Sequence, residues 1–287
     1  MGLTIKELLP VGEKTLKDAG VENYKIDAEA LLGFVSGMDK KDLFLNQDSD
    51  VSDSLIYKYF ALLSRRKIGE PLQYITGEQY FMGHRFAVDT SVLIPRPETE
   101  ILAEKAIEYL QSNCDANSVL DLCTGSGALA ISIALACPNV KVAASDVSAA
   151  ALAVAKQNAI DLGISGRIDF IESDLFAAFG HMNKFDLIVT NPPYIRSEDL
   201  SGLTREIKDH EPLSALDGGP DGLDFYKRIA TDARTYMNND ACMMTEIGAD
   251  QACDVTAIFT ESGFTIIGIF RDYNDLDRVL MVSGRCT

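Results

Sequence analysis

The segment Asn191-Pro192-Pro193-Tyr194 holds residue types that suit chemistry on a planar nitrogen. An amide or exocyclic amino nitrogen is a poor nucleophile because its lone pair is delocalised. The Asn191 side-chain oxygen and the Pro192 carbonyl can each accept one of its N–H groups, which favours the positive charge that develops as the nitrogen attacks an activated methyl group. The two prolines would hold this carbonyl in place, and Tyr194 would offer a flat face. A simple rigid turn after a strand is the alternative.

A second candidate site is the turn Asp121-Leu122-Cys123-Thr124-Gly125-Ser126-Gly127, which follows a short apolar strand. Small residues let a ligand approach the backbone, and the amino terminus of the helix that follows favours a carboxylate. Such a turn also suits a dinucleotide, or packing alone. The predicted cofactor contacts in this turn are Cys123, Thr124, Gly125, Ser126 and Gly127.

Two further predicted strands end in acidic residues. Asp146 can accept hydrogen bonds from both hydroxyls of a ribose, although either it or Ser148 could instead cap the next helix. Asp174 can accept from an adenine amino group, with Leu175 or Phe176 packed on the ring, but an acid in a loop is equally consistent with Asp174 alone. We therefore predict Asp146, Asp174, Leu175 and Asn191 as cofactor contacts.

The elements that must position these residues alternate between strand and helix from about residue 90 onward. The predicted strands are 118–122, 140–145, 168–172, 185–190, 241–246, 264–270 and 279–282, and the predicted helices are 128–136 and 149–162. This order indicates an α/β fold with a mostly parallel sheet and helices on both faces. The last two strands have no helix between them and are predicted to pair antiparallel at an edge. Ligands in such sheets bind beyond the carboxyl ends of the strands, so all four motifs should share one cleft.

The first part of the chain has a helical pattern instead. A first predicted helix carries Ile5, Leu8 and Leu9 on one face, and a second, capped by Asp27, carries Ala30, Leu31 and Phe34. A third, capped by Ser52 or Asp53, carries Leu55, Ile56, Tyr59, Phe60 and Leu63. Aromatic and polar residues then alternate between Gln73 and Val88, which predicts a β-hairpin. We expect a helical bundle over residues 1–72, a hairpin linker over 73–90 and the α/β domain over 91–287.

Composition limits the classes of function. The 287 residues are 47% hydrophobic and 24% charged, with a net charge of -17. Proteins that bind nucleic acid usually present a basic face, and the only short basic run, Arg65–Lys67, is expected to be a solvated helix end. We expect no direct nucleic-acid partner. No run of eighteen apolar residues and no signal-peptide pattern occur, so a cytoplasmic protein without membrane association is expected. The six cysteines form no C-x-x-C pair, which argues against a zinc site or disulfide framework and for reduced thiols.

The chain resembles the release factor glutamine methyltransferase family, also called HemK, over nearly its full length. The resemblance rests on the turn at 121–127 and on Asn191–Ile195, together with Gly69–Ile75, Ile94–Glu100, Glu211-Pro212, Ala215-Leu216 and Asp221–Leu223. The Asn-Pro-Pro-Tyr segment alone is shared by many amino methyltransferases, whereas its combination with Pro95-Arg96-Pro97-Glu98-Thr99-Glu100 and a helical amino-terminal domain is much narrower.

The resemblance implies a Rossmann-like S-adenosylmethionine-dependent methyltransferase sheet with an N-terminal helical-bundle domain and a β-hairpin linker. It implies that the enzyme, expected to be a monomer without a metal, methylates the glutamine N5 atom in the Gly-Gly-Gln loop of peptide chain release factors. Cys123–Gly127 and Asp146 would hold the cofactor, Asn191–Tyr194 the glutamine, and the amino-terminal helices would help dock the release factor. Cys123 stands where the family usually has glycine, and Leu175 where it often has an aromatic residue.

Three alternatives stay open at this point. An adenine-N6 methyltransferase acting on DNA or RNA needs the same nitrogen chemistry but must extrude its base, and the acidity of the chain argues against it. A binding module that lost catalysis is disfavoured by the intact Asn191–Tyr194 segment. An NAD-dependent dehydrogenase is disfavoured because the first turn lacks a full G-x-G-x-x-G pattern.

Overall fold

The computed structural model describes residues 3–180 and 184–284, and contacts within it divide the chain into two compact units. The helical unit comprises Met1–Gly77 and Thr204–His210, and the sheet unit comprises Glu78–Leu203 and Glu211–Thr287. The domain boundaries predicted at residues 72 and 90 are drawn where the type of secondary structure changes, whereas the two units are defined by contacts. These boundaries therefore stay a prediction. No sequence pattern assigned Thr204–His210 to the helical part.

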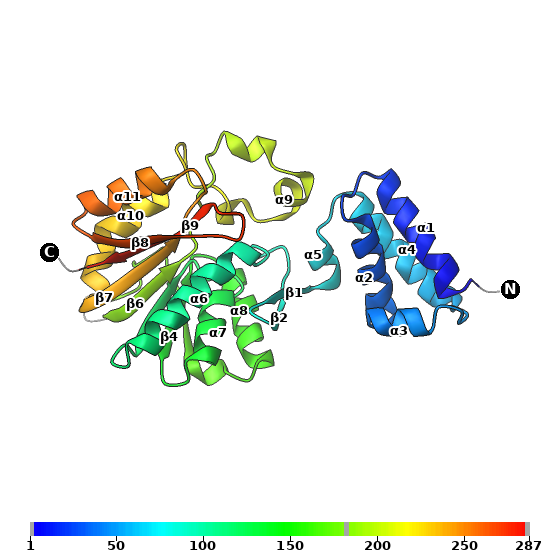
Figure 1. Cartoon of the computed structure of the whole chain (residues 1–287), viewed down its shortest axis with the longest axis horizontal. Coiled ribbons are helices and arrows are strands. Elements are labelled where there is room, and N and C mark those ends of the chain that lie inside the picture. Colours follow the sequence, from blue (N-terminus) through cyan, green and yellow to red (C-terminus); the bar gives the residue numbers. More distant parts are fainter. Residues whose placement is uncertain (1–2, 181–183, 285–287) are drawn as a thin grey trace. The chain divides into compact units, whose positions relative to one another are not determined.

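The helical unit is a small bundle, as predicted. Its helices are α1 (Ile5–Asp18), α2 (Tyr24–Ser36), α3 (Lys40–Leu45), α4 (Asp53–Lys67), α5 (Leu72–Thr76) and α9 (Arg205–His210). Helices α1, α2 and α4 pack against one another (Figure 1). Tyr59 is fully buried among them and donates its hydroxyl to the Ala28 carbonyl at 3.1 Å. Gly12 faces this tyrosine, where a Cβ atom would collide with the ring.

The second helix begins earlier than predicted. Ser52 caps α4, since its hydroxyl accepts from the Leu55 N–H, and that prediction is confirmed. Asp27, however, is not a cap: α2 starts at Tyr24, which places Asp27 inside the first turn and facing the interior. The predicted apolar face of α2 is wrong at Phe34, which is 49% exposed.

A buried ion pair explains both Asp27 and the basic run at Arg65–Lys67. Arg66 is 5% exposed rather than solvated. Its guanidinium donates to Asp27 at 2.7 Å, to Glu206 at 2.5 Å and to the Glu70 carbonyl at 3.0 Å. The expectation of a solvated helix end is therefore wrong for Arg66. Because Glu206 lies on α9, this contact also ties the segment Thr204–His210 into the helical unit.

The predicted hairpin is present but shorter. Strands β1 (Glu78–Phe81) and β2 (His84–Ala87) pair antiparallel. Residues 73–76, predicted as part of the hairpin, belong to α5 instead. Gly77 ends that helix and Gly83 makes the hairpin turn, and both have φ of +75°, a left-handed conformation that favours glycine.

The sheet unit is built on seven strands in the order β5-β4-β3-β6-β7-β9-β8. Their bounds are β3 (Ser118–Leu122), β4 (Lys141–Asp146), β5 (Ile168–Glu172), β6 (Phe185–Thr190), β7 (Met237–Glu246), β8 (Thr265–Arg271) and β9 (Asp277–Ser283). The strands β3 to β7 are parallel, whereas β9 and β8 run antiparallel at one edge. The predicted strands, their parallel core and the antiparallel edge pair are confirmed.

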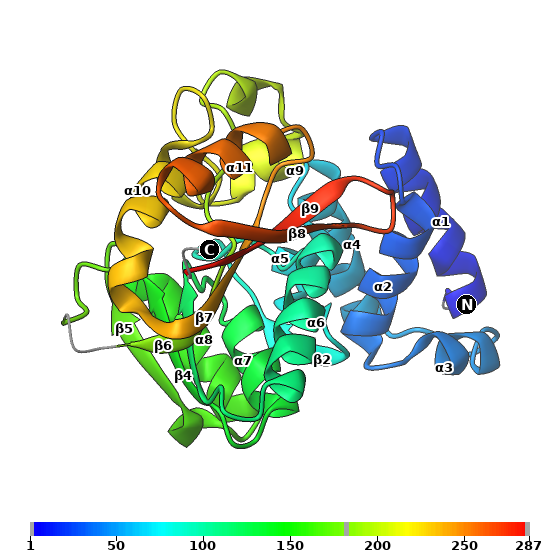
Figure 2. The same ribbon diagram turned by 60° about the vertical axis from the view of Figure 1, so that its left-hand side comes forward.

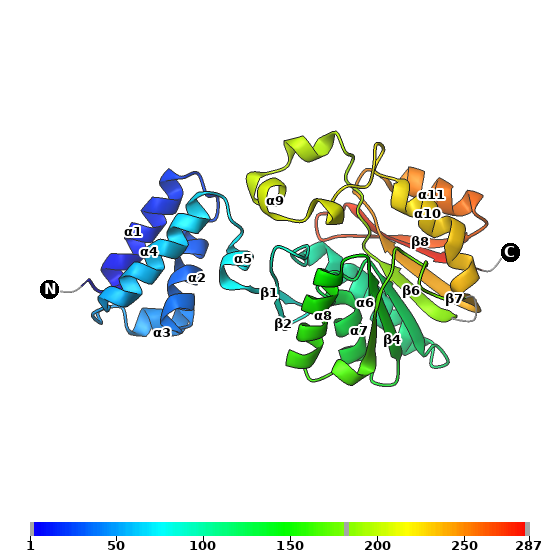
Figure 3. The same cartoon turned by 180° about the vertical axis from the view of Figure 1, so that it is seen from behind.

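Helices cover both faces of the sheet, as Figures 2 and 3 show from two sides. The helices α6 (Pro97–Ser112), α7 (Ala128–Ala136) and α8 (Ala149–Asp161) lie on one face, and α10 (Asp224–Asp232) and α11 (Ala252–Glu261) on the other. Neighbouring strand residues alternate between the two cores: Val119 packs under the first set of helices and Leu120 under the second. Helices α6, α10 and α11 lie outside the predicted elements. Within the described residues, no helix is long and apolar enough to cross a membrane.

The strand order changes direction between β3 and β6. Leu122 at the end of β3 pairs with Thr190 at the end of β6, so the next residues, Cys123 and Asn191, leave the sheet side by side. This is the switch point at which open α/β sheets bind ligands.

Candidate functional site

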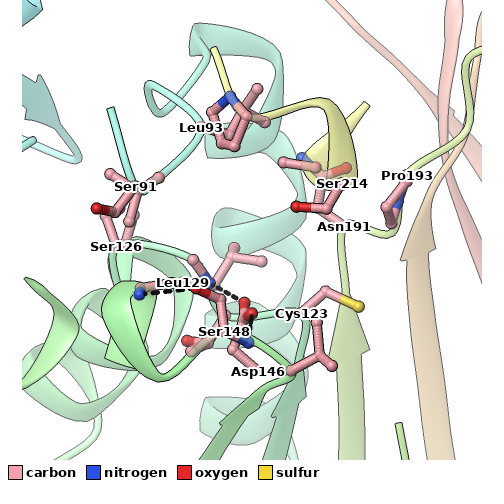
Figure 4. Close-up of a pocket in the computed structure, with 18 of the residues that line it drawn as sticks. Ser91, Leu93, Cys123, Ser126, Leu129, Asp146, Ser148, Asn191, Pro193 and Ser214 are labelled. Carbon is pink, nitrogen blue, oxygen red and sulfur yellow. Dashed lines mark hydrogen bonds between the residues drawn. The ribbon is translucent and has the colours of Figure 1, made fainter. Parts of the chain in front are cut away.

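An open cleft lies beyond the carboxyl ends of β3, β4 and β6, enclosing about 970 Å³ of empty space that is partly open to solvent. Most of the predicted residues line it: Cys123, Thr124, Gly125, Ser126, Asp146, Asp174, Leu175, Asn191 and Pro193. Figure 4 shows Asn191, Pro193 and Ser214 gathered on one side, and Cys123, Asp146 and Ser148 below them. The structure thus brings the two predicted constellations into one cavity.

Three predicted residues, Gly127, Pro192 and Tyr194, are not among those lining the cleft. Gly127 has φ of +82° and sits where a Cβ atom would come within 3.0 Å of Ile131 and 3.1 Å of Ala155. Its role in the structure is therefore the tight turn into α7. Tyr194 packs on the core and donates its hydroxyl to Glu246 at 3.3 Å, so its ring is not presented as a wall of the cleft.

Asp146 ties the two cofactor turns together. Its carboxylate accepts from the backbone N–H of Gly125 and from that of Ser148, both at 2.9 Å. The helix α8 is capped by Ser148, whose hydroxyl accepts from the Ala151 N–H at 3.1 Å. Asp146 is therefore not the cap, and its carboxylate remains in the cleft wall. Burial raises the pKa of Asp146 above its ordinary value, against these hydrogen bonds that lower it.

The segment after β5 forms another wall of the cleft. Leu175 lines the cavity with φ of +49°, whereas Phe176 stacks on Tyr236 with ring centroids 4.7 Å apart. Packing on an adenine ring is thus open to Leu175 but not to Phe176. The carboxylate of Asp174 receives both of its 2.8 Å hydrogen bonds from Arg228, which leaves this acid paired at the rim.

The turn after β3 contains an unusual conformation and a buried acid. Cys123 has φ of +59°, the left-handed region that costs a residue with a Cβ atom about 1 kcal/mol or more. Burial raises the pKa of its thiol well above the ordinary value, so the thiol stays neutral. Asp121 is fully buried and accepts from the Thr124 hydroxyl at 2.6 Å and from the Ala130 N–H at 3.2 Å through Oδ2, while Oδ1 has no partner among the described groups.

Asn191 is held by a chain of side chains that sequence reasoning did not find. Its Nδ2 donates to the Thr99 hydroxyl oxygen at 3.1 Å, and that hydroxyl donates to Glu246 Oε2 at 2.7 Å. Glu246 is 1% exposed, and this burial raises its pKa to about 7. Since Asn191 uses its nitrogen in this contact, its Oδ1 remains available as an acceptor at the cleft.

A further wall comes from two loops for which no direct contact was predicted. The cleft is lined from one side by Ser91, Val92, Leu93, Pro95, Arg96 and Thr99, and from another by Pro212, Ser214 and Ala215. Arg96 donates to the buried Glu211 at 2.5 Å, which joins the two loops. Pro95, Arg96, Thr99, Pro212 and Ala215 belong to segments that carried the family resemblance, so for these residues the motifs were the available signal, whereas Ser91, Val92, Leu93 and Ser214 lie outside those segments. The sequence also held a signal for Glu246, because this residue is an acid at the carboxyl end of a predicted buried strand.

Two family models match the chain. The PrmC N-terminal domain matches residues 7–77, and the methyltransferase small domain matches residues 99–207. Among curated proteins, the release factor glutamine methyltransferase of Clostridium acetobutylicum is 38% identical over 97% of this chain and 98% of that protein. The protein of that name from Geobacter sulfurreducens is 40% identical over 98% of this chain and 96% of its own length.

Solved structures show the same fold. The catalytic domain of hMettl16, solved with an RNA hairpin, superposes with a TM-score of 0.56 at 13% identity, over 82% of this chain and 83% of that one. A methyltransferase from Pyrococcus furiosus superposes with a TM-score of 0.52 at 14% identity, over 71% of this chain and 90% of that one. At these identities the likeness concerns the fold, and it confirms the predicted methyltransferase sheet.

Proposed function

The chain belongs to the release factor glutamine methyltransferase family, and on this premise we propose that it methylates the side-chain amide nitrogen of the glutamine in the Gly-Gly-Gln motif of peptide chain release factors. The methyl donor is S-adenosylmethionine. Family membership gives no support to the alternative of an adenine-N6 methyltransferase acting on DNA or RNA.

The cleft residues fit this cofactor. Gly125 has φ of +54° and open space where a Cβ atom would be, so the turn lets a ligand lie against the backbone. Asp146 would accept from the ribose hydroxyls, and Leu175 would cover one face of the adenine. When bound, the cofactor supplies a methyl group activated by a sulfonium centre.

The observation that carries the proposal is the orientation of Asn191. Its amide nitrogen is engaged by Thr99, which leaves its Oδ1 as the acceptor for an N–H group of the substrate. An acceptor fixed in advance favours the positive charge that builds on the amide nitrogen during attack, without any rearrangement at that moment. We propose that the Pro192 carbonyl accepts the second N–H group.

Orientation of the two reactants would be the main contribution of the site. Asn191 and the neighbouring backbone would fix the amide nitrogen, and the walls around Leu93, Pro95, Pro212 and Ala215 would exclude water from it. No dedicated base is required, because the methylated nitrogen can release its proton to water after transfer. We further propose that the helical unit docks the release factor.

The proposal is tested by incubating the protein with methyl-labelled S-adenosylmethionine and purified release factors, and by locating the label with mass spectrometry. Label on the Gly-Gly-Gln glutamine is expected, and it should survive nuclease treatment. Asn191→Ala should reduce the single-turnover rate by roughly 10²–10³, the effect of losing one preorganised contact at a reacting centre. Cofactor affinity, measured by calorimetry, should change little. Label on another residue, or an Asn191→Ala variant with the wild-type rate, would contradict the proposal.

A further inference from the structure

We propose that Thr99 and Glu246 are positioning residues that set the direction of the Asn191 amide, so that an oxygen and not an NH2 group meets the methyl acceptor. The inference rests on the proposed function of Asn191. We call the chain Asn191–Thr99–Glu246 the positioning relay. Neither Thr99 nor Glu246 was assigned a role by the sequence motifs.

Three elements of the sheet unit build the relay. Thr190 on β6 pairs with Thr245 on β7, so the following residues, Asn191 and Glu246, emerge at the same edge of the sheet. Thr99 lies in the first turn of α6, which begins at Pro97. Its hydroxyl fills the space between the other two side chains, 3.1 Å from Asn191 Nδ2 and 2.7 Å from Glu246 Oε2.

The direction of the relay follows from counting protons. An ionised carboxylate can only accept, and a threonine hydroxyl has one proton to donate. Since Thr99 gives that proton to Glu246, its oxygen is left to accept, and only the NH2 group of Asn191 can satisfy it. The amide oxygen must then point away from Thr99. An asparagine has no intrinsic preference between its two amide orientations, so the charge on Glu246 decides.

Protonation of Glu246 would remove this constraint. A carboxylic acid can donate to Thr99, whose proton is then free to bond the Asn191 oxygen. The amide would turn its NH2 group toward a substrate nitrogen that also donates, and no acceptor would remain. Transfer should therefore require the ionised form of Glu246.

The surroundings of Glu246 place its titration in an accessible range. Burial, and to a smaller extent the charge of Glu98, raise its pKa to about 7. The Thr99 hydroxyl, Arg278 from β9 and the Tyr194 hydroxyl act in the opposite direction and lower this pKa. Arg278 is itself paired with Asp272 at 3.0 Å. Tyr226, from α10, donates to the Glu246 carbonyl rather than to the carboxylate. With this balance the relay is set above about pH 7 and is lost as the pH falls below it.

Four variants separate the relay from general disruption. Thr99→Val keeps the shape but removes the hydroxyl, whereas Thr99→Ser keeps it. Glu246→Gln keeps an acceptor but removes both the charge and the titration. Thr245→Val is the matched control, because Thr245 is also a buried threonine, next to Glu246 in the sequence, and its hydroxyl donates to the Glu246 backbone carbonyl. Single-turnover rates on a fixed release factor would be measured between about pH 5.5 and 8.5, with cofactor affinity measured by calorimetry.

For the wild type we expect a rate that falls on the acid side with a midpoint near the pKa of about 7. Thr99→Val should lower the rate by roughly 10-fold to 100-fold, less than the roughly 10²–10³ for loss of a direct contact, and its acid limb should disappear. Thr99→Ser should restore most of the rate. Glu246→Gln should also be slow and independent of pH over this range. Cofactor affinity should stay close to that of the wild type throughout.

The relay and the proposed function fail in different ways. If Asn191→Ala is inactive but Thr99→Val and Glu246→Gln keep the wild-type rate and pH profile, the relay is wrong and the function of Asn191 stands. If Asn191→Ala keeps the wild-type rate, the proposed role of Asn191 is wrong and the relay falls with it, whereas label on a residue other than the Gly-Gly-Gln glutamine would show that the proposed function is wrong. A loss in Thr245→Val equal to that in Thr99→Val would also overturn the relay. Should Thr99→Val fail to fold, an acid limb that persists in Glu246→Gln would overturn it independently.

Discussion

Asp146 Oδ2 accepts a 2.9 Å hydrogen bond from the backbone N–H of Gly125, so the end of β4 is joined directly to the glycine turn after β3. The other oxygen of this carboxylate accepts from the Ser148 N–H, also at 2.9 Å. Asp146 therefore shapes the turn that receives the cofactor, in addition to offering acceptors to a ribose. This double role changes what substitution of Asp146 should do.

Asp146→Ala should weaken S-adenosylmethionine binding by about 1–3 kcal/mol, because it removes hydrogen bonds to a charged acceptor and releases the Gly125 turn. Titration calorimetry measures the effect. Asp186→Ala is the matched control, since that carboxylate also accepts backbone N–H groups, from Asn117 at 2.9 Å and Ser118 at 3.0 Å, but at the amino end of β3. Equal loss of cofactor affinity in both variants would contradict the assignment of Asp146.

The buried ion pairs of Arg66 predict a large difference between neighbouring arginines. Arg66→Met leaves Asp27 buried without its partner, which typically costs about 3–5 kcal/mol. Arg65→Met removes the contact to Glu70 from a side chain that is 43% exposed, and should cost less than about 1 kcal/mol. Urea unfolding followed by circular dichroism would compare the two. Similar losses in both variants would show that burial of Arg66 has no special energetic role.

The proposed docking role of the helical unit predicts a change in substrate binding alone. Phe44 and Leu45 on α3 are 69% and 66% exposed, which makes them candidates for contact with a release factor. Replacing both with serine should raise KM for the factor by about five-fold or more, since the few apolar or aromatic side chains that anchor an interface each contribute over about 1 kcal/mol. The rate at saturating substrate and the cofactor affinity should not change.

The control for this test is Ile267→Ser, which removes an apolar side chain of 54% exposure from β8 in the sheet unit. Its KM should match the wild type, and an unchanged KM in the α3 variant would contradict docking at that face. Surface substitutions are preferable to deletion of residues 1–70, because α9 packs within the helical unit and would lose its partners.

The main-chain frame of the site was predictable because it depends on local pattern. Short apolar runs such as Ser118–Leu122 and Phe185–Thr190 have the predicted bounds, and the rule that ligands bind beyond strand ends placed Cys123 and Asn191 together. Both conclusions can be reached without knowing which strands are neighbours elsewhere in the sheet than at the switch point between β3 and β6.

The relay and the buried arginine were not predictable because each depends on residues far apart in sequence. Thr99 and Glu246 are separated by 147 positions, and they meet because α6 packs against β7. The register of β7 on β6 then places Glu246 beside Asn191. Arg66 meets Glu206 across 140 positions, whereas the local charge pattern indicated a solvated helix end. Periodicity describes which face of an element is apolar, but not which distant side chain will satisfy a buried charge.

Two buried carboxyl groups should make stability fall as the pH rises. Burial raises the pKa of Asp121 from 3.8, and that of Glu246 from 4.5, in both cases to about 7. At a pH between the ordinary pKa of each group and its raised pKa, the folded state binds more protons than the unfolded state. The free energy of unfolding therefore decreases with increasing pH in this range. Each raised pKa corresponds to an upper bound of about 3–4 kcal/mol. Carboxylates with a lowered pKa, such as Asp186, are ionised in both states above about pH 5 and do not contribute here.

Urea unfolding of the cofactor-free protein between about pH 5 and 8 measures this slope. Asp121→Asn and Glu246→Gln should each flatten it by removing one titrating group, and the double variant should keep only the smaller slope of the other buried acids with a raised pKa, Asp27 and Asp146. Asp115→Asn, at an exposed acid, is the control and should keep the wild-type slope. A wild-type protein that becomes more stable from pH 5 to 8 would show that these two carboxyl groups are not held protonated by burial, and the acid limb expected for the positioning relay would lose its physical basis.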